Sequence, residues 1–347
     1  MLAALAVLAG IYAGSHGLKH FDPAVTSYAI GSVLAAFAVA YRFTVWAQRP
    51  PSLMYFQRGL QLLLRRASRR SASPPNTPAL HHSTSPALTL AGAATANFAA
   101  QNFIRRRSWY RWVMHLCLSG GCTLAFAITF PLVFGWVHFA ARPDNAEIYR
   151  VLLFGFPVDE FSVHSAKAFV MFNLLNFSAI IVLVGLVMAA IRRVTDAGER
   201  ATQKFWEDIL PLLLIFAVTA TGLMLTVSYK LMAGRGHGTV AIVHAASVVA
   251  LLLYIPFGKL FHMFQRTCSL CVSLYKKSGE AGPRAHCRRC GADFASQMHV
   301  DDLKTVLDQL GFNYRFATTK GEIHYQDICP ACRRRLLALN QGRSVGR

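Results

Sequence analysis

Long apolar stretches alternate with short polar ones along most of this chain. Five of them reach the length of about 20 residues that a helix needs to cross the hydrocarbon core of a bilayer. These stretches are Ser27–Trp46, Trp112–Val137, Ala168–Ile191, Ile209–Tyr229 and Gly238–Phe264. None of them contains an acidic side chain. The pattern therefore predicts an all-α bundle of five transmembrane helices.

The first 14 residues are also apolar but too short for a standard span. They fit a sixth span, a helix lying on the membrane surface, or the core of a signal peptide. A signal peptide normally begins with a positively charged region, and no basic residue precedes this stretch. We therefore favour an ordered helix over a cleaved signal.

Composition and charge support a membrane protein. Of the 347 residues 54% are apolar and only 15% charged, which excludes a soluble globular enzyme and a disordered chain. The net charge of +20 is unevenly placed, since Arg49–Arg107 holds nine arginines and no acid. The positive-inside rule puts this segment, Arg192–Lys204 and the C-terminus in the cytoplasm. We expect a bacterial-type inner membrane protein that binds the lipid bilayer and no nucleic acid.

Three segments between the spans have patterns of their own. Tyr55–Arg70 places Phe56, Leu60, Leu63 and Leu64 near helical spacing among arginines, as in a basic amphipathic helix on the inner membrane surface. A solvated basic loop is the alternative. Residues 67–99 are rich in Ser, Pro, Thr and Ala and predict a flexible cytoplasmic linker. Asn145–Ser165 predicts a short interfacial helix with a loop.

Residues 1–264 therefore form the expected transmembrane domain, and residues 265–347 a small cytoplasmic α+β domain. In the latter, Asp301–Leu310 has the pattern of an amphipathic helix, and Tyr314–Tyr325 alternates like two short strands.

Two cysteine knuckles lie in this C-terminal part. They consist of Cys287 with Cys290 and of Cys329 with Cys332, each pair separated by two residues. Two such turns can close a tetrahedral site of four sulfurs, which suits structural zinc or, as in rubredoxins, a single iron. A cytoplasmic position argues against disulfides. We expect zinc, because a small polar domain needs such a staple to fold.

Two histidines of the fifth stretch, His244 and His262, are 18 positions apart. In a continuous helix this is five turns, so both would lie on one face, about 27 Å apart. Ionisable residues inside a membrane are candidates for function, and neutral imidazole is an axial ligand of haem iron. Ordinary interhelical hydrogen bonds are the alternative. The pair predicts two haems, one near each membrane surface.

The second stretch offers partners for these ligands. His115 lies at its cytoplasmic end, where it can face His262, and His138 lies at its outer end, where it can face His244. His164, also on the outer side, is the alternative to His138.

Two basic residues lie close to the inner haem expected between these helices. Arg111 and Lys259 can pair with the haem propionates, or they can simply reach the lipid headgroups.

The fifth stretch, with its two histidines around Ile255-Pro-Phe-Gly-Lys-Leu, resembles the last helix of the gamma subunit of respiratory nitrate reductase. It is also similar to the related membrane cytochrome of the heterodisulfide reductase type, and the resemblance extends loosely over residues 28–264. It implies two b haems, quinol oxidation near the outer one, and a quinol contact at the position of Lys167. The family's second histidine in helix two falls near Ala125 here, so the outer haem needs another ligand or is absent.

The function expected from these features is that of a membrane cytochrome b subunit of a respiratory or redox complex. It would take electrons from the quinone pool and pass them to a cytoplasmic catalytic partner, a molybdoenzyme or an iron–sulfur protein. No catalytic residue of its own is predicted. The alternatives are a membrane-tethered zinc-ribbon adaptor or assembly protein and, less favoured, a transporter.

Overall fold

The structure is a computed structural model that describes residues 1–71, 91–92, 94–318 and 321–346. It divides into two compact units. The membrane unit comprises Met1–Arg42 and Thr95–Met263, and the tail unit comprises Phe43–Ala94 and Phe264–Arg347. The boundary lies inside the first long helix, so the chain leaves and re-enters the membrane unit.

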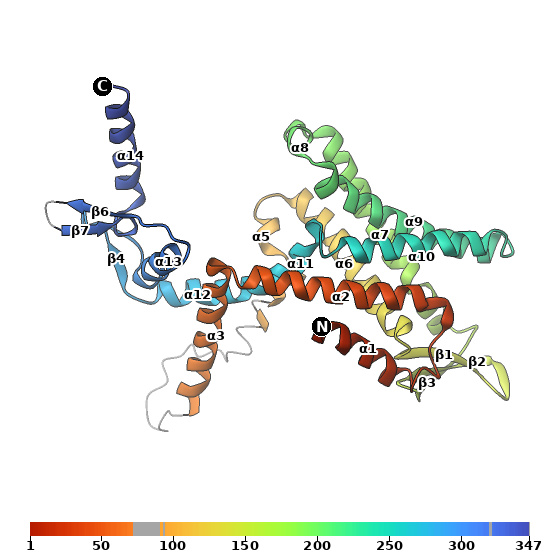
Figure 1. Ribbon diagram of the computed structural model, residues 1–347. Coiled ribbons are helices and arrows are strands. Elements are labelled where there is room, and N and C mark those ends of the chain that lie inside the picture. The colour runs from red at the N-terminus through yellow and green to blue at the C-terminus, as the bar shows by residue number, and fades with distance from the viewer. Residues whose placement is uncertain (72–90, 93, 319–320, 347) are drawn as a thin grey trace. The chain divides into compact units, whose positions relative to one another are not determined.

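Within the described residues, five helices are long and apolar enough to cross a membrane, as predicted (Figure 1). They are α2 (Thr26–Ala47), α6 (Trp109–Val133), α7 (Ala166–Thr195), α9 (Leu210–Leu231) and α10 (His237–Tyr254). This is a multi-pass membrane protein by helix length and hydropathy. Short helices α5 (Asn102–Arg105) and α8 (Ala197–Thr202) and π-helical turns at Thr95–Ala99 and Phe205–Ile209 lie next to these spans.

Small residues bring α6 and α7 into close contact. A Cβ on Gly121 of α6 would lie 2.6 Å from Val182, and one on Gly185 of α7 would lie 2.8 Å from Leu118. Such close approach is the usual basis of helix packing in membranes, where burial of apolar surface gives little driving force. The buried core of this part includes Val182 with Leu251 of α10.

The fifth stretch is not one helix, and the five-turn geometry predicted for His244 and His262 is wrong. Helix α10 ends at Tyr254, a 3-10 turn covers Lys259–Phe261, and the short helix α11 (His262–Gln265) follows. Pro256 has no N–H for the helical ladder and its ring disfavours continuation. The two histidines therefore lie on separate elements.

The arginine of the first span stabilises this break. Arg42 donates a hydrogen bond to the carbonyl oxygen of Pro256. Its guanidinium also stacks on the buried ring of Phe261, 4.5 Å from the centroid. The Pro256 carbonyl, which the helix break leaves without a helical donor, thus accepts from a charged group. The Arg42 guanidinium, whose charge would be costly among apolar helices, gains this acceptor and the ring of Phe261.

The segment predicted as an interfacial helix is instead part of an antiparallel sheet, so that prediction is wrong. The strands β1 (Val137–Arg142), β2 (Asn145–Leu153) and β3 (Phe156–Ser162) pair in sequence order. Phe154 and Gly155 join β2 to β3 with φ of +50° and +79°, as in the two-residue turns that favour hairpins. Val151 and Phe161 of this sheet pack on Ala168 at the start of α7.

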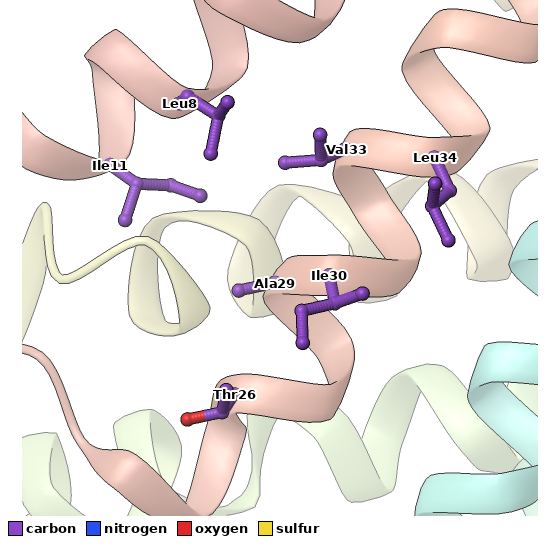
Figure 2. Close-up of a pocket in the computed structure, with 7 residues that line it drawn as sticks. All are labelled: Leu8, Ile11, Thr26, Ala29, Ile30, Val33 and Leu34. Atoms are coloured by element: carbon purple, nitrogen blue, oxygen red, sulfur yellow. The ribbon is translucent and has the colours of Figure 1, made fainter.

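The apolar N-terminal stretch forms the ordered helix α1 (Leu2–Gly14), as expected. Its 13 residues rise about 20 Å, which is short of the hydrocarbon thickness. Trp136 fixes it, because its indole N–H donates to the Gly10 carbonyl at 2.8 Å. Leu8 and Ile11 of α1 face residues 26–34 of α2 across an apolar cavity of about 210 Å³ (Figure 2).

The tail unit is a small α+β assembly. Its helices are α3 (Pro50–Ser71), α12 (Ser269–Glu280), α13 (Gln297–Gln309) and α14 (Pro330–Ser344). Its strands form the antiparallel pairs β4 (Arg284–His286) with β5 (Asp293–Ser296), and β6 (Arg315–Thr318) with β7 (Gly321–His324). The predicted helices and the strand pair near residue 320 are confirmed. Most of the predicted linker at 67–99 lies outside the described residues.

One buried carboxylate joins three helices of the tail unit. Asp302 of α13 is 6% exposed and accepts bonds from Arg58 of α3 at 2.6 and 3.1 Å and from the Tyr275 hydroxyl of α12 at 2.9 Å. Tyr275 is itself buried, and burial with the adjacent carboxylate raises its pKa well above the usual range. The phenol therefore stays a donor to the carboxylate.

Replacing Asp302 with asparagine should loosen this contact. The change removes the charge that Arg58 and Tyr275 are arranged around, which typically costs several kcal/mol in a buried pair. Because the Arg58 side chain is 40% exposed, we expect about 2 kcal/mol, or about 30-fold faster amide exchange across α13. Hydrogen exchange on the full chain measures this. Asp301→Asn, on the exposed side of α13, is the matched control and should leave the exchange rates unchanged.

Candidate functional site

The four cysteines of the two knuckles come together in the tail unit. Cys287 and Cys290 flank the turn between β4 and β5, while Cys329 is the N-cap of α14 and Cys332 lies in its first turn. Their sulfurs all lie within 4.8 Å of one another, and those of Cys290 and Cys329 are 3.7 Å apart. Sulfurs on a tetrahedral zinc with bonds of about 2.3 Å are about 3.8 Å apart. This cluster can hold a metal ion such as zinc.

Local backbone geometry favours charged sulfur at this site. Burial of the Cys287 thiol opposes its ionisation, but N–H groups of Cys329, Cys290 and Arg289 outweigh this and lower its pKa to about 6. Burial and the neighbouring thiols raise the pKa of Cys332 to about 12. The thiolate of Cys287 is thus favoured, and that of Cys332 is opposed by its neighbours. A dication that stabilises all four is the natural complement.

In the membrane unit the structure brings His115 and His262 together. Their ring centroids are 6.4 Å apart. Two imidazoles on opposite sides of one metal ion, each with a metal–nitrogen distance of about 2 Å, have centroids about 6 Å apart. His115 comes from α6 and His262 from α11, whose position depends on the break at Pro256.

Each of these histidines uses Nδ1 for an oxygen acceptor. The Nδ1 atom of His115 lies 2.7 Å from Gln101 Oε1, and that of His262 lies 2.6 Å from the Lys259 carbonyl oxygen. An acceptor at Nδ1 keeps the proton there and leaves Nε2 as the basic nitrogen of the ring. Metal-ligating histidines have this arrangement, because the acceptor fixes the ring and raises its basicity.

Sequence reasoning missed Gln101. Its side chain is 6% exposed, its backbone is left-handed with φ of +48°, and its amide also donates to Ser119 at 2.7 Å. A non-glycine residue in that region is uncommon and is held by its surroundings. A glutamine before an arginine-rich turn carries no recognisable signal, since only the fold brings it to His115.

The other predicted histidines do not form a second pair of this kind. His138 in β1 stacks on His20, with centroids 4.4 Å apart, and burial with the neighbouring His20 lowers its pKa. His244 of α10 has its Nδ1 atom 2.9 Å from the Thr221 hydroxyl. His164 lies in the turn after β3. Within the described residues, no ring contact links His244 to either candidate partner.

The predicted basic residues lie as follows. Lys259 forms an ion pair with Asp208, and Lys167 forms one with Asp159 of β3. Arg111 lines an open cavity of about 400 Å³ between α6 and α7.

A scan of protein-family models finds no match to this chain, and searches of curated proteins and of solved structures find none either. The protein is a multi-pass membrane protein with a four-cysteine site that can hold a metal.

Proposed function

We propose that this protein is a membrane electron carrier that binds one b-type haem between His115 and His262. The observation that carries the proposal is the histidine pair itself, with centroids 6.4 Å apart and both Nδ1 atoms on oxygen acceptors. Haem iron accepts two axial imidazoles, and the bound group supplies one-electron chemistry. An ordinary interhelical contact would not need both rings to keep the same nitrogen basic.

The chain's own residues would set the properties of this site. Gln101 and the Lys259 carbonyl orient the two rings and increase their basicity, which favours the oxidised form of a bound metal. The break at Pro256 puts His262 on α11, an element separate from α10.

The outer haem of the resembled family is not part of this proposal. Ala125 replaces a ligand, His138 stacks on His20, and His244 lies next to Thr221. One haem per chain is therefore the expected stoichiometry.

The source and destination of the electrons rest on the resemblance alone. By that resemblance, quinol is oxidised on the outer side near Lys167, and a cytoplasmic molybdoenzyme or iron–sulfur protein receives the electrons. The four-cysteine site is proposed to hold structural zinc rather than iron, since it staples a small polar domain.

A reduced-minus-oxidised spectrum of the detergent-solubilised full chain tests the proposal. We expect a b-type alpha band and, by pyridine haemochrome, about one haem per chain. Two haems per chain would contradict the single site and return His138, His164 and His244 to consideration. Absence of haem from protein made with ample haem supply would overturn the electron-carrier proposal and leave the membrane-tethered adaptor.

A further inference from the structure

Helix α3 keeps an apolar face exposed although it belongs to a folded unit. Leu53, Phe56 and Leu60 are 38%, 38% and 54% exposed. Their spacing of three and then four residues places all three on one side of the helix. An exposed apolar stripe on an ordered helix calls for a covering partner.

The opposite side of α3 is already in use. Arg58 binds Asp302, Gly59 is buried against Cys271, and the Tyr55 ring contacts Tyr275 edge-on at 5.1 Å. A Cβ on Gly59 would lie 2.6 Å from that of Cys271, so the contact with α12 is close. At 100° per residue these positions are centred about 140° from the apolar stripe. One side of the helix therefore packs inside the tail unit, and the other side is exposed.

Chain connectivity indicates what covers the apolar stripe. The membrane-spanning helix α2 ends at Ala47 and α3 begins at Pro50, so only Gln48 and Arg49 separate them. Two residues reach at most about 7 Å, which keeps the start of α3 at the membrane surface. Trp46, at the end of the span, has the side chain that favours this interface.

The charge of α3 also indicates that the bilayer covers the apolar stripe. Helix α3 contains five arginines, at positions 58, 65, 66, 69 and 70, and no acidic residue. A basic amphipathic helix with leucine and phenylalanine on its other side binds in the plane of an anionic bilayer surface. A protein partner is not needed to explain either feature.

We propose that α3 lies in the bilayer interface with Leu53, Phe56 and Leu60 among the lipid chains, and that its other face holds the four-cysteine domain. The metal domain is thus tied to the membrane surface by Arg58 and Asp302, and not only by its connection to the last span. This proposal does not depend on haem binding.

Site-specific photocrosslinking tests it on the full chain in nanodiscs of phosphatidylcholine and phosphatidylglycerol. p-Benzoylphenylalanine replaces Leu60 in one protein and Gln61 in another. Gln61 is exposed and lies about 100° away around the helix, so it is the matched control. We expect lipid adducts at position 60 to exceed those at 61 by about fivefold or more, and the same excess at position 56. Adducts are counted by mass spectrometry of the α3 peptide.

Equal lipid labelling at 60 and 61, or crosslinks from 56 and 60 to protein instead of lipid, would overturn the proposal. An Arg58→Ala variant tests the second face. It should keep lipid adducts at position 60 while amide exchange in α13 becomes about tenfold faster or more. Unchanged exchange would show that α3 does not hold the metal domain.

Discussion

Replacing Cys329 with serine should remove the metal and unfold the small domain around it. Cys329 is buried, caps α14 and places its sulfur 3.7 Å from that of Cys290. Metal binding contributes about 10 kcal/mol or more to the folding of comparable sites. The core beneath the site is small, with Ile328 fully enclosed and Phe294 and Phe316 only half-buried. Such a core does not replace that contribution.

Two measurements on the full chain check this prediction. Metal content by plasma mass spectrometry should fall from about one zinc per chain to none, and amides of β4 to β7 and α14 should lose their protection against exchange. Cys117→Ser, in α6, is the matched control and should retain both zinc and protection. A Cys329→Ser protein that contains no metal but keeps full protection of its amides against exchange would show that metal binding by the four sulfurs does not hold this domain together.

The parts of the fold set by local pattern were predictable from the sequence. Apolar length identifies a membrane-spanning helix, because a helix satisfies its backbone hydrogen bonds within the one segment. Cysteine spacing predicts the four-cysteine cluster that can hold a metal, because two residues between two ligands form the turn that such a site uses. The amphipathic pattern of Asp301–Leu310 likewise predicted α13, which the structure confirms.

Two local signals of the observed structure are present in the sequence but were not used in the predictions. Pro256 lies inside the fifth apolar stretch and lacks the N–H that a continuous helix needs. The prediction followed the hydropathy of the stretch alone, so a broken helix was predicted as continuous. The alternation in β2 and the Phe154-Gly155 turn are signals of a hairpin. A helix was predicted there because the segment lies between two membrane spans.

Contacts between residues far apart in the sequence could not be predicted, for a different reason. Arg58 and Asp302 are 244 positions apart, and Gln101 reaches His115 only because its backbone adopts a left-handed conformation. Neither pairing leaves a trace in periodicity or composition. The structure brings together the rings of His115 and His262, one of the two predicted pairs, and places Gln101, which the sequence did not single out, beside the first of them.

Replacing His262 with alanine should abolish haem binding, and His115→Ala should do the same. Each change removes one of the two axial nitrogens of the proposed site, and the single imidazole that is left holds the iron with one bond fewer. The alpha band and the haem-to-chain ratio of the purified protein measure the loss. His244→Ala is the control within the same membrane unit, because its ring is bound to Thr221 and lies outside the pair. Loss of haem from His244→Ala alone would contradict the assignment.

Gln101→Leu separates a ligand site from a mere contact between two rings. Leucine fills a similar volume but offers no acceptor to His115 Nδ1, while Ser119 keeps its bond to the His115 carbonyl at 2.7 Å. Losing such a supporting acceptor typically weakens metal binding 10- to 100-fold. We therefore expect a protein that folds, binds haem more weakly by about that factor and has a higher midpoint potential, because a less basic imidazole stabilises the oxidised iron less. If haem affinity and potential both stayed unchanged, Gln101 would not orient an axial ligand, and the His115–His262 pair would lose its main support.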